Sequence, residues 1–107
     1  MENLAMTTDE VKALLERIER GDSPDRARLE ETLTDGYALA LNLDAECRRL
    51  ERRISANAEQ LAEESSEERA RELSGLARML TRRRQELDSL RALLAGLRSG
   101  VRPASAA

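Results

Sequence analysis

The sequence predicts an all-α protein in which a short N-terminal helix precedes a long antiparallel two-helix coiled-coil hairpin, assembled as a dimeric helical bundle. Two observations support this fold class. Apolar residues recur at alternating steps of three and four residues in two separate stripes, which is the spacing of a coiled-coil seam. In addition, 36% of the residues are charged and Tyr37 is the only aromatic residue, which is typical of helical bundles rather than β-domains.

Two apolar stripes form the predicted seam. The first comprises Leu29, Leu33, Gly36, Ala40, Leu43, Cys47, Leu50, Ile54, Asn57 and Leu61. The second comprises Leu73, Leu76, Leu80, Arg83, Leu87, Leu90, Leu94, Leu97 and Val101. They are out of frame, because continuing the first stripe leads to Glu64, Glu68 and Arg71, which cannot form a seam. The chain therefore has to change between residues 62 and 71.

A fold-back centred on Ser65 places the two stripes face to face. In this register the small Gly36 lies opposite the large Leu94, and layers that combine large and small side chains pack well. Ser65 and Glu68 also have the spacing of a capping box, which starts a new helix. These features favour a hairpin.

The alternative is one continuous helix that dimerises with a copy of itself. Residues 62–71 contain neither glycine nor proline, so the frame shift could be an interruption of a coiled coil. The charges favour the hairpin, because residues 24–64 carry 6 basic and 10 acidic side chains whereas residues 65–107 carry 9 and 5. Arms of opposite charge attract each other more than copies of themselves.

Capping signals set the expected element boundaries. Thr7 and Glu10 form a capping box that starts the short helix, and Gly21 stops it. Ser23 and Pro24 suit the N-cap and first position of the first arm. The expected organisation is a disordered leader at 1–6, a single helical domain at 7–101 and a disordered tail at 102–107. Within the domain we expect helices at 7–20, 24–63 and 66–99.

The open end of the hairpin is richer in apolar residues than its seam requires. One flank carries Leu39 and Leu93, and the other carries Tyr37 and Leu41. The short helix has one apolar stripe and can cover only one flank, so the other should be an exposed patch that binds a protein partner. The expected interface residues are Tyr37, Leu39, Leu41, Met79 and Leu93. On the Leu39 flank we expect Glu46 and Glu86 to repel each other, leaving it without salt bridges.

Eight arginines form a belt at mid-height of the predicted hairpin. We interpret the belt as a solvated, salt-bridged face, with Asp44 and Glu51 beside Arg84 and Arg91, and with Arg53 near Glu72. A functional alternative is the binding of polyanions. Besides Arg83 of the seam, the belt comprises Arg48, Arg49, Arg52, Arg53, Arg78, Arg82 and Arg84.

Cys47 faces Arg83 within the leucine seam. A small core cysteine, with Arg83 extending to solvent over its apolar stem, explains this pair. The functional alternative is a thiolate whose pKa is lowered by the guanidinium.

The sequence lacks the usual combinations of catalytic side chains. Histidine is absent, a single cysteine is present, and there is no glycine-rich phosphate loop. We therefore expect no enzymatic activity, no cofactor and no metal. No signal peptide or apolar run of about 20 residues is present, which predicts a cytoplasmic protein without membrane contact.

The predicted function is that of a non-catalytic helical interaction module, acting as an adaptor, a regulator or a self-assembling protein. Its partner is expected to be a second copy or another helical protein. The alternative is a nucleic-acid-associated factor that uses the arginine belt. This alternative is disfavoured because no aromatic residues are interleaved with the arginines for base stacking and the net charge is −3.

Overall fold

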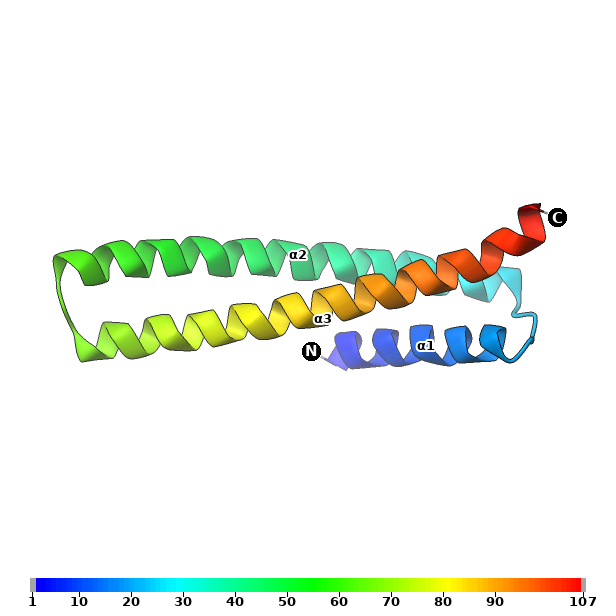
Figure 1. Ribbon diagram of the computed structural model, residues 1–107, viewed down its shortest axis with the longest axis horizontal. Coiled ribbons are helices and arrows are strands. Elements are labelled where there is room, and N and C mark those ends of the chain that lie inside the picture. The colour runs from blue at the N-terminus through cyan, green and yellow to red at the C-terminus, as the bar shows by residue number, and fades with distance from the viewer. Residues whose placement is uncertain (1, 107) are drawn as a thin grey trace. The chain divides into compact units, whose positions relative to one another are not determined.

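The computed structural model describes the backbone of residues 2–106 and the side chains of residues 4–99. Over these residues the chain forms α1 (Glu2–Glu19), α2 (Arg26–Glu63) and α3 (Glu67–Ala106), and no strand (Figure 1). The predicted all-α fold class is confirmed. None of the described helices is both long and apolar enough to cross a membrane.

Helix α1 begins earlier than its capping box predicts. It starts at Glu2, so Thr7 lies inside the helix and the expected disordered leader at 1–6 is wrong from Glu2 onward; Met1 lies outside the described residues. The apolar stripe explains the difference, because half-buried Leu4 is followed at helical spacing by buried Val11 and Leu14. Burial of this stripe outweighs the local capping preference.

Gly21 ends α1 in the role that the sequence predicts. Its φ of 91° lies in the left-handed region, which favours glycine. The amide of Gly21 donates to the carbonyl of Ile18 at 3.0 Å, and the amide of Asp22 donates to that of Arg17 at 3.0 Å. Together these two bonds form a Schellman motif.

The N-termini of the two long helices are each capped slightly later than predicted. The amide of Leu29 donates to the Asp25 carbonyl at 3.0 Å, so Asp25, not Ser23, is the N-cap of α2. At α3, the side-chain oxygen of Ser66 accepts a 3.4 Å hydrogen bond from the amide of Arg69. Ser66, not Ser65, is therefore the cap. Helix α3 then continues to Ala106, beyond the predicted end at 99. The backbone of the predicted tail at 102–107 is therefore helical as far as Ala106, whereas Ala107 and the side chains of this segment lie outside the described residues.

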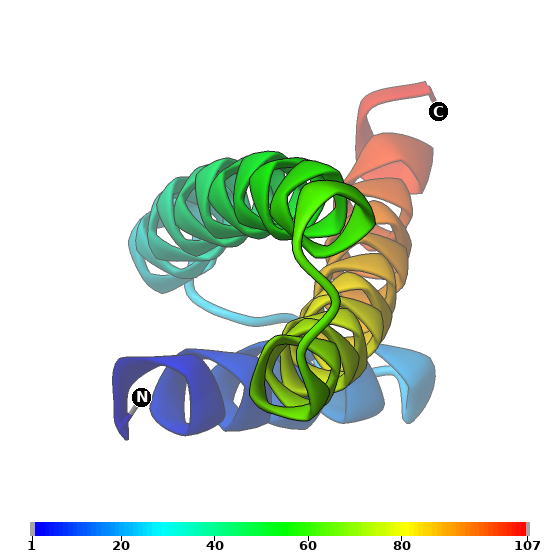
Figure 2. The same cartoon turned by 90° about the vertical axis from the view of Figure 1, so that its left-hand side faces the viewer.

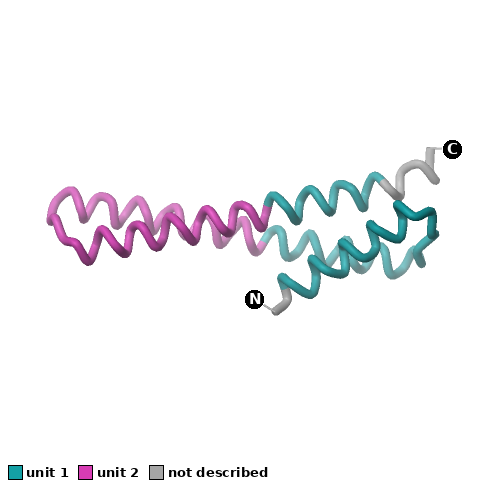
Figure 3. Tube along the Cα trace, turned by 60° about the horizontal axis from the view of Figure 1, so that its bottom comes forward, with its two compact units in different colours: residues 1–41, 88–107 teal, residues 42–87 magenta. Residues whose placement is uncertain are grey.

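The chain divides into two compact units (Figure 3). Unit 1 consists of residues 1–41 and 88–107, and unit 2 of residues 42–87. Unit 1 thus contains α1 with the first part of α2 and the last part of α3. Unit 2 contains the remainder of the two long helices and the connection between them.

The core of unit 1 is formed by leucines and by close helix approaches at glycine. Leu90, Leu94 and Leu97 of α3 are almost completely buried. Gly36 of α2 is buried directly against Leu94, so there is no space for a side chain at this position. On another face of α3, the methyl groups of Leu15 from α1 lie over Gly96. Small residues therefore allow both contacts.

In unit 2, the parts of α2 and α3 run antiparallel and are joined by residues 64–66 (Figures 1 and 2). Beside the connection, the guanidinium of Arg69 donates a hydrogen bond to the side chain of Gln60 on the opposite helix. The buried seam residues of the unit are Leu43, Cys47, Leu50, Leu76, Leu80, Arg83 and Leu87.

Candidate functional site

Unit 1 has one flank beneath α1 and one flank exposed. Leu15 of α1 lies over Gly96, and Leu93 is on the same face of α3 at a spacing of three residues. Helix α1 therefore covers the flank of Leu93, which is half-buried, as is Leu39. On α2, Tyr37 and Leu41 are 40% and 72% exposed. The structure thus selects the flank that the sequence left undecided.

The exposed flank, which we call the Tyr37 face, is formed by two helices. Tyr37, Arg91, Ala95, Arg98 and Ser99 line a shallow hollow of about 350 Å³. Leu41 follows Tyr37 by one helical turn and extends the apolar surface.

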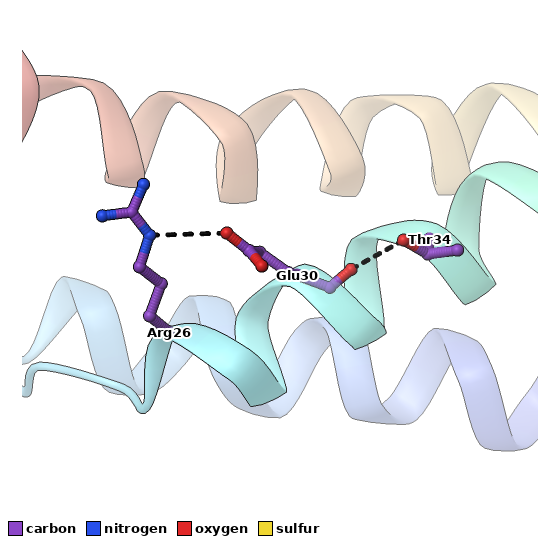
Figure 4. A network of polar contacts seen from close by, with 3 residues as sticks. All are labelled: Arg26, Glu30 and Thr34. Atoms are coloured by element: carbon purple, nitrogen blue, oxygen red, sulfur yellow. Dashed lines mark hydrogen bonds and ion pairs between the residues drawn. The ribbon is translucent and has the colours of Figure 1, made fainter.

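The Tyr37 face continues along α2 toward its first turn. Arg26, Glu30 and Thr34 precede Tyr37 at spacings of four, four and three residues, which places all of them on one side of the helix. Arg26 pairs with the Glu30 carboxylate at 3.4 Å, and the Thr34 hydroxyl donates to the Glu30 carbonyl at 2.9 Å. Figure 4 shows these two contacts along the helix. The end of the face near the start of α2 is therefore polar.

Met79, the remaining predicted interface residue, belongs to unit 2. Its side chain is 45% exposed on α3. It follows the same helical face as Arg82 and Glu86, because the three residues are separated by steps of three and four.

Arg83 occupies the centre of unit 2 and holds two carboxylates. It is only 6% exposed, its Nε lies 3.0 Å from Glu46 of α2, and its Nη1 lies 2.8 Å from Glu86 of α3. The expected repulsion between Glu46 and Glu86 is therefore wrong, because one guanidinium lies between them. The expectation that Arg83 extends to solvent is wrong for the same reason. The hydrogen bond to Glu86 is the main cause that raises the pKa of Arg83, so the group remains charged.

Cys47 is a buried thiol within the same seam. Burial raises its pKa, and this effect exceeds the opposing influence of Arg84. The alternative of a thiolate activated by a guanidinium is therefore wrong, and the structure agrees with a small core cysteine.

We predict slow alkylation of Cys47 in the folded protein. Iodoacetamide at neutral pH should modify it at least about tenfold more slowly than in the urea-unfolded chain, because the buried thiol is both protonated and shielded. Mass spectrometry of timed samples measures both rates, and equal rates would contradict the burial of this side chain.

The arginine belt contains both paired and unpaired side chains. Arg48 pairs with Asp44 at 3.2 Å, and Arg84 pairs with Glu51 at 2.5 Å across the two helices. The Nε of Arg78 donates to the Ser74 carbonyl at 3.4 Å. Within residues 4–99, no carboxylate lies within ion-pair distance of the remaining members, Arg49, Arg52, Arg53 and Arg82. The expected proximity of Arg53 to Glu72 thus gives no ion pair.

Three unpaired arginines lie on one flank of unit 2. Glu46, Arg49 and Arg53 share a face of α2, since they are separated by steps of three and four residues. Arg82 and Glu86 share a face of α3 for the same reason. Because Arg83 binds both Glu46 and Glu86, it places these two faces beside each other. We call Arg49, Arg53 and Arg82 the Arg triad.

The role of Arg83 was missed because an arginine in a leucine seam usually extends along the nearest path to water. A local signal was present, since Glu86 follows Arg83 by three residues on the same helix. The hairpin register also places Glu46 almost level with Arg83 on the other helix. An arginine at a seam position with a carboxylate on each helix predicts the bridge.

The described side chains also include groups of glutamates near the connection between α2 and α3. In the part of the chain that the structure describes, no group of three or more histidine, cysteine, aspartate or glutamate side chains is placed to hold a metal ion. Comparisons with protein-family models, with curated proteins and with solved structures find no match for this chain.

Proposed function

We propose that the protein is a non-catalytic helical interaction module that associates with a second copy of itself through the Tyr37 face. The observation that supports this proposal is the exposure of Tyr37 and Leu41 on the flank that α1 leaves open. The proposal includes the cytoplasmic location that the sequence predicts. Another helical protein could occupy the same face, and the experiment below distinguishes the two occupants.

The charges on the Tyr37 face favour a second copy as the partner. Helix α2 contributes Glu30 to one side of the face, and α3 contributes Arg91 and Arg98 to the other. A two-fold axis parallel to the helices brings α2 of each copy against α3 of the other, so that acidic and basic sides meet twice. The apolar Tyr37 and Leu41 then lie inside a larger helical bundle.

Burial of the apolar side chains supplies the stabilising energy of this association. Covering a leucine that is now 72% exposed contributes about 1.5–3 kcal/mol in each copy. Tyr37 adds a flat apolar ring with a hydroxyl that remains near the polar rim. The complementary charges mainly determine the orientation of the two copies.

We predict that Leu41→Asp converts a dimer into a monomer. An aspartate at the centre of the interface would be buried without a partner, and the loss of two leucines should weaken association by a factor of about a hundred or more. Multi-angle light scattering over a range of concentrations measures the mass of each form. A wild-type protein that remains monomeric at high concentration would exclude the second copy and leave a foreign helical partner for this face.

Two controls test the location of the interface. Ala13→Asp introduces the same charge at an exposed position of α1, and it should leave the dimer intact. Glu30→Arg and Arg98→Glu should each weaken the dimer, whereas their combination should restore it. Failure of the combined variant to recover would contradict the two-fold arrangement, even if Leu41→Asp dissociates the protein.

A further inference from the structure

The positive charge of the Arg triad is not neutralised by ion pairs, and for Arg49 and Arg82 the reason is that the neighbouring carboxylates are bound elsewhere. Glu46 lies one helical turn from Arg49, and Glu86 lies one turn from Arg82, which are the usual positions of surface ion-pair partners. Both carboxylates instead turn toward the buried guanidinium of Arg83, at 3.0 and 2.8 Å. Arg49 and Arg82 are thereby left without a carboxylate among the described residues, and Arg53 has no carboxylate three or four residues away on its own helix.

Arg83 also links the two helix faces that carry these three arginines. It joins the face of α2 that carries Arg49 and Arg53 to the face of α3 that carries Arg82. Like charges on adjacent turns repel each other, and the binding of a multivalent anion would relieve this repulsion. Arginine is suited to such a ligand, because its planar guanidinium donates two parallel hydrogen bonds to a phosphate.

We propose that the Arg triad binds the phosphate backbone of duplex nucleic acid without sequence specificity. This function goes beyond self-association and uses a surface of unit 2, whereas the Tyr37 face belongs to unit 1. Arg52 and Arg78 are exposed on the outer sides of the same segments, so positive charge extends past the triad. An extended polyanion matches this distribution better than a single small phosphate ligand.

The composition of unit 2 favours a duplex over a single strand. Recognition of single strands depends on aromatic side chains that stack with bases, and the one aromatic residue of the chain, Tyr37, belongs to unit 1. A duplex presents its phosphates outside and requires no stacking. Six of the ten acidic residues of unit 2 lie toward the connection between the helices, and their repulsion of phosphate keeps the affinity modest. They are Glu59, Glu63, Glu64, Glu67, Glu68 and Glu72.

Fluorescence anisotropy with a short labelled DNA duplex of mixed sequence tests the proposal on the full chain. Wild type should bind at low salt, with a slope of log affinity against log salt of about −2.7, that is, about −0.9 for each of three neutralised phosphates. Replacing the triad by glutamine should weaken binding about tenfold or more and reduce the slope toward zero. Absence of binding by wild type at low salt would overturn the proposal.

A matched control separates the triad from net charge. Glutamine at Arg17, Arg20 and Arg28, which are exposed in unit 1 and lie outside the Tyr37 face, changes the total charge equally and should leave the affinity within about twofold. An equal loss in both triple variants would overturn the assignment of the site. Retention on heparin without binding to the duplex would overturn the assignment of the ligand.

A second set of variants tests why the triad is unpaired. Arg83→Leu releases Glu46 and Glu86, which can then turn toward Arg49 and Arg82, so duplex binding should fall several-fold although Arg83 is buried. Adding Glu46→Gln and Glu86→Gln to this variant should restore the binding. Circular dichroism verifies that all variants are helical. Unchanged binding by Arg83→Leu would contradict the proposed link between the buried and exposed arginines.

Discussion

Replacing Arg83 by leucine should leave the free energy of unfolding unchanged or raise it by about 1–4 kcal/mol, although the arginine makes two ion pairs. Its side chain is buried in a seam of leucines, and removing a guanidinium from water has a large energetic cost that the carboxylates offset only in part. Leucine fits the neighbouring layers of Leu80 and Leu87, and the released Glu46 and Glu86, whose side chains are 34% and 29% exposed, can turn to water. Urea unfolding followed by circular dichroism measures the change.

The opposite result is expected when the carboxylates are removed and the arginine stays. Glu46→Ala with Glu86→Ala should lower the free energy of unfolding by about 3–5 kcal/mol, because a buried charge then lacks its partners. Glu51→Ala is the matched control, since its pair with Arg84 is exposed on both sides and contributes at most about 1 kcal/mol. Similar losses in the control and the double variant would show that Arg83 is solvated.

Truncating Leu94 to alanine is the second substitution with a large expected effect. Leu94 is 1% exposed and packs against Gly36, so its loss should leave a cavity and lower the free energy of unfolding by about 2–5 kcal/mol. Gly36→Ala should also destabilise, because the added Cβ would overlap Cδ2 of Leu94. Overpacking of this kind costs about 1–3 kcal/mol, of which the better helix propensity of alanine offsets about 1 kcal/mol.

The double variant determines whether these two residues form one layer. When Leu94 is also alanine, the Cβ added at Gly36 fills part of the cavity, so the combined loss should be smaller than the sum of the two losses. Gly75→Ala is the control, because no atom lies within 4 Å of the added Cβ. It should raise the free energy of unfolding by about 1 kcal/mol through helix propensity alone. Additive losses at Gly36 and Leu94 would contradict the close approach of the helices.

The sequence predicted those features that depend on periodic burial. The steps of three and four residues indicated the helical class, and the large-against-small pairing of Gly36 with Leu94 is present in unit 1. The left-handed conformation of Gly21 also followed from local chemistry alone. Signals of this kind depend on one or two residues and their immediate neighbours.

The features that the sequence did not predict result from competition between local and tertiary interactions. Thr7 and Ser65 have good capping patterns, yet the burial of Leu4 and the cap at Ser66 set the actual boundaries. The flank chosen by α1 depends on how closely Leu15 can approach Gly96, which no periodicity reveals. In the candidate site, the exposed arginines were identified, but the origin of their unpaired state was not. The neighbouring carboxylates are bound by Arg83, a side chain that was expected to extend to solvent.

The bridge made by Arg83 also determines which alignments of the two long helices are tolerated. Leucines are interchangeable, so a seam made only of leucines fits almost as well after sliding by one heptad. Such a slide would replace Glu46 beside Arg83 by Leu39 in one direction and by Arg53 in the other. Either neighbour removes the carboxylate that α2 supplies and leaves Arg83 with Glu86 of its own helix alone, and the second adds a like charge. Arg83 thus adds little to the stability of the fold but specifies one alignment of the two helices. A leucine in its place would give an equally or more stable protein whose helices are aligned less uniquely.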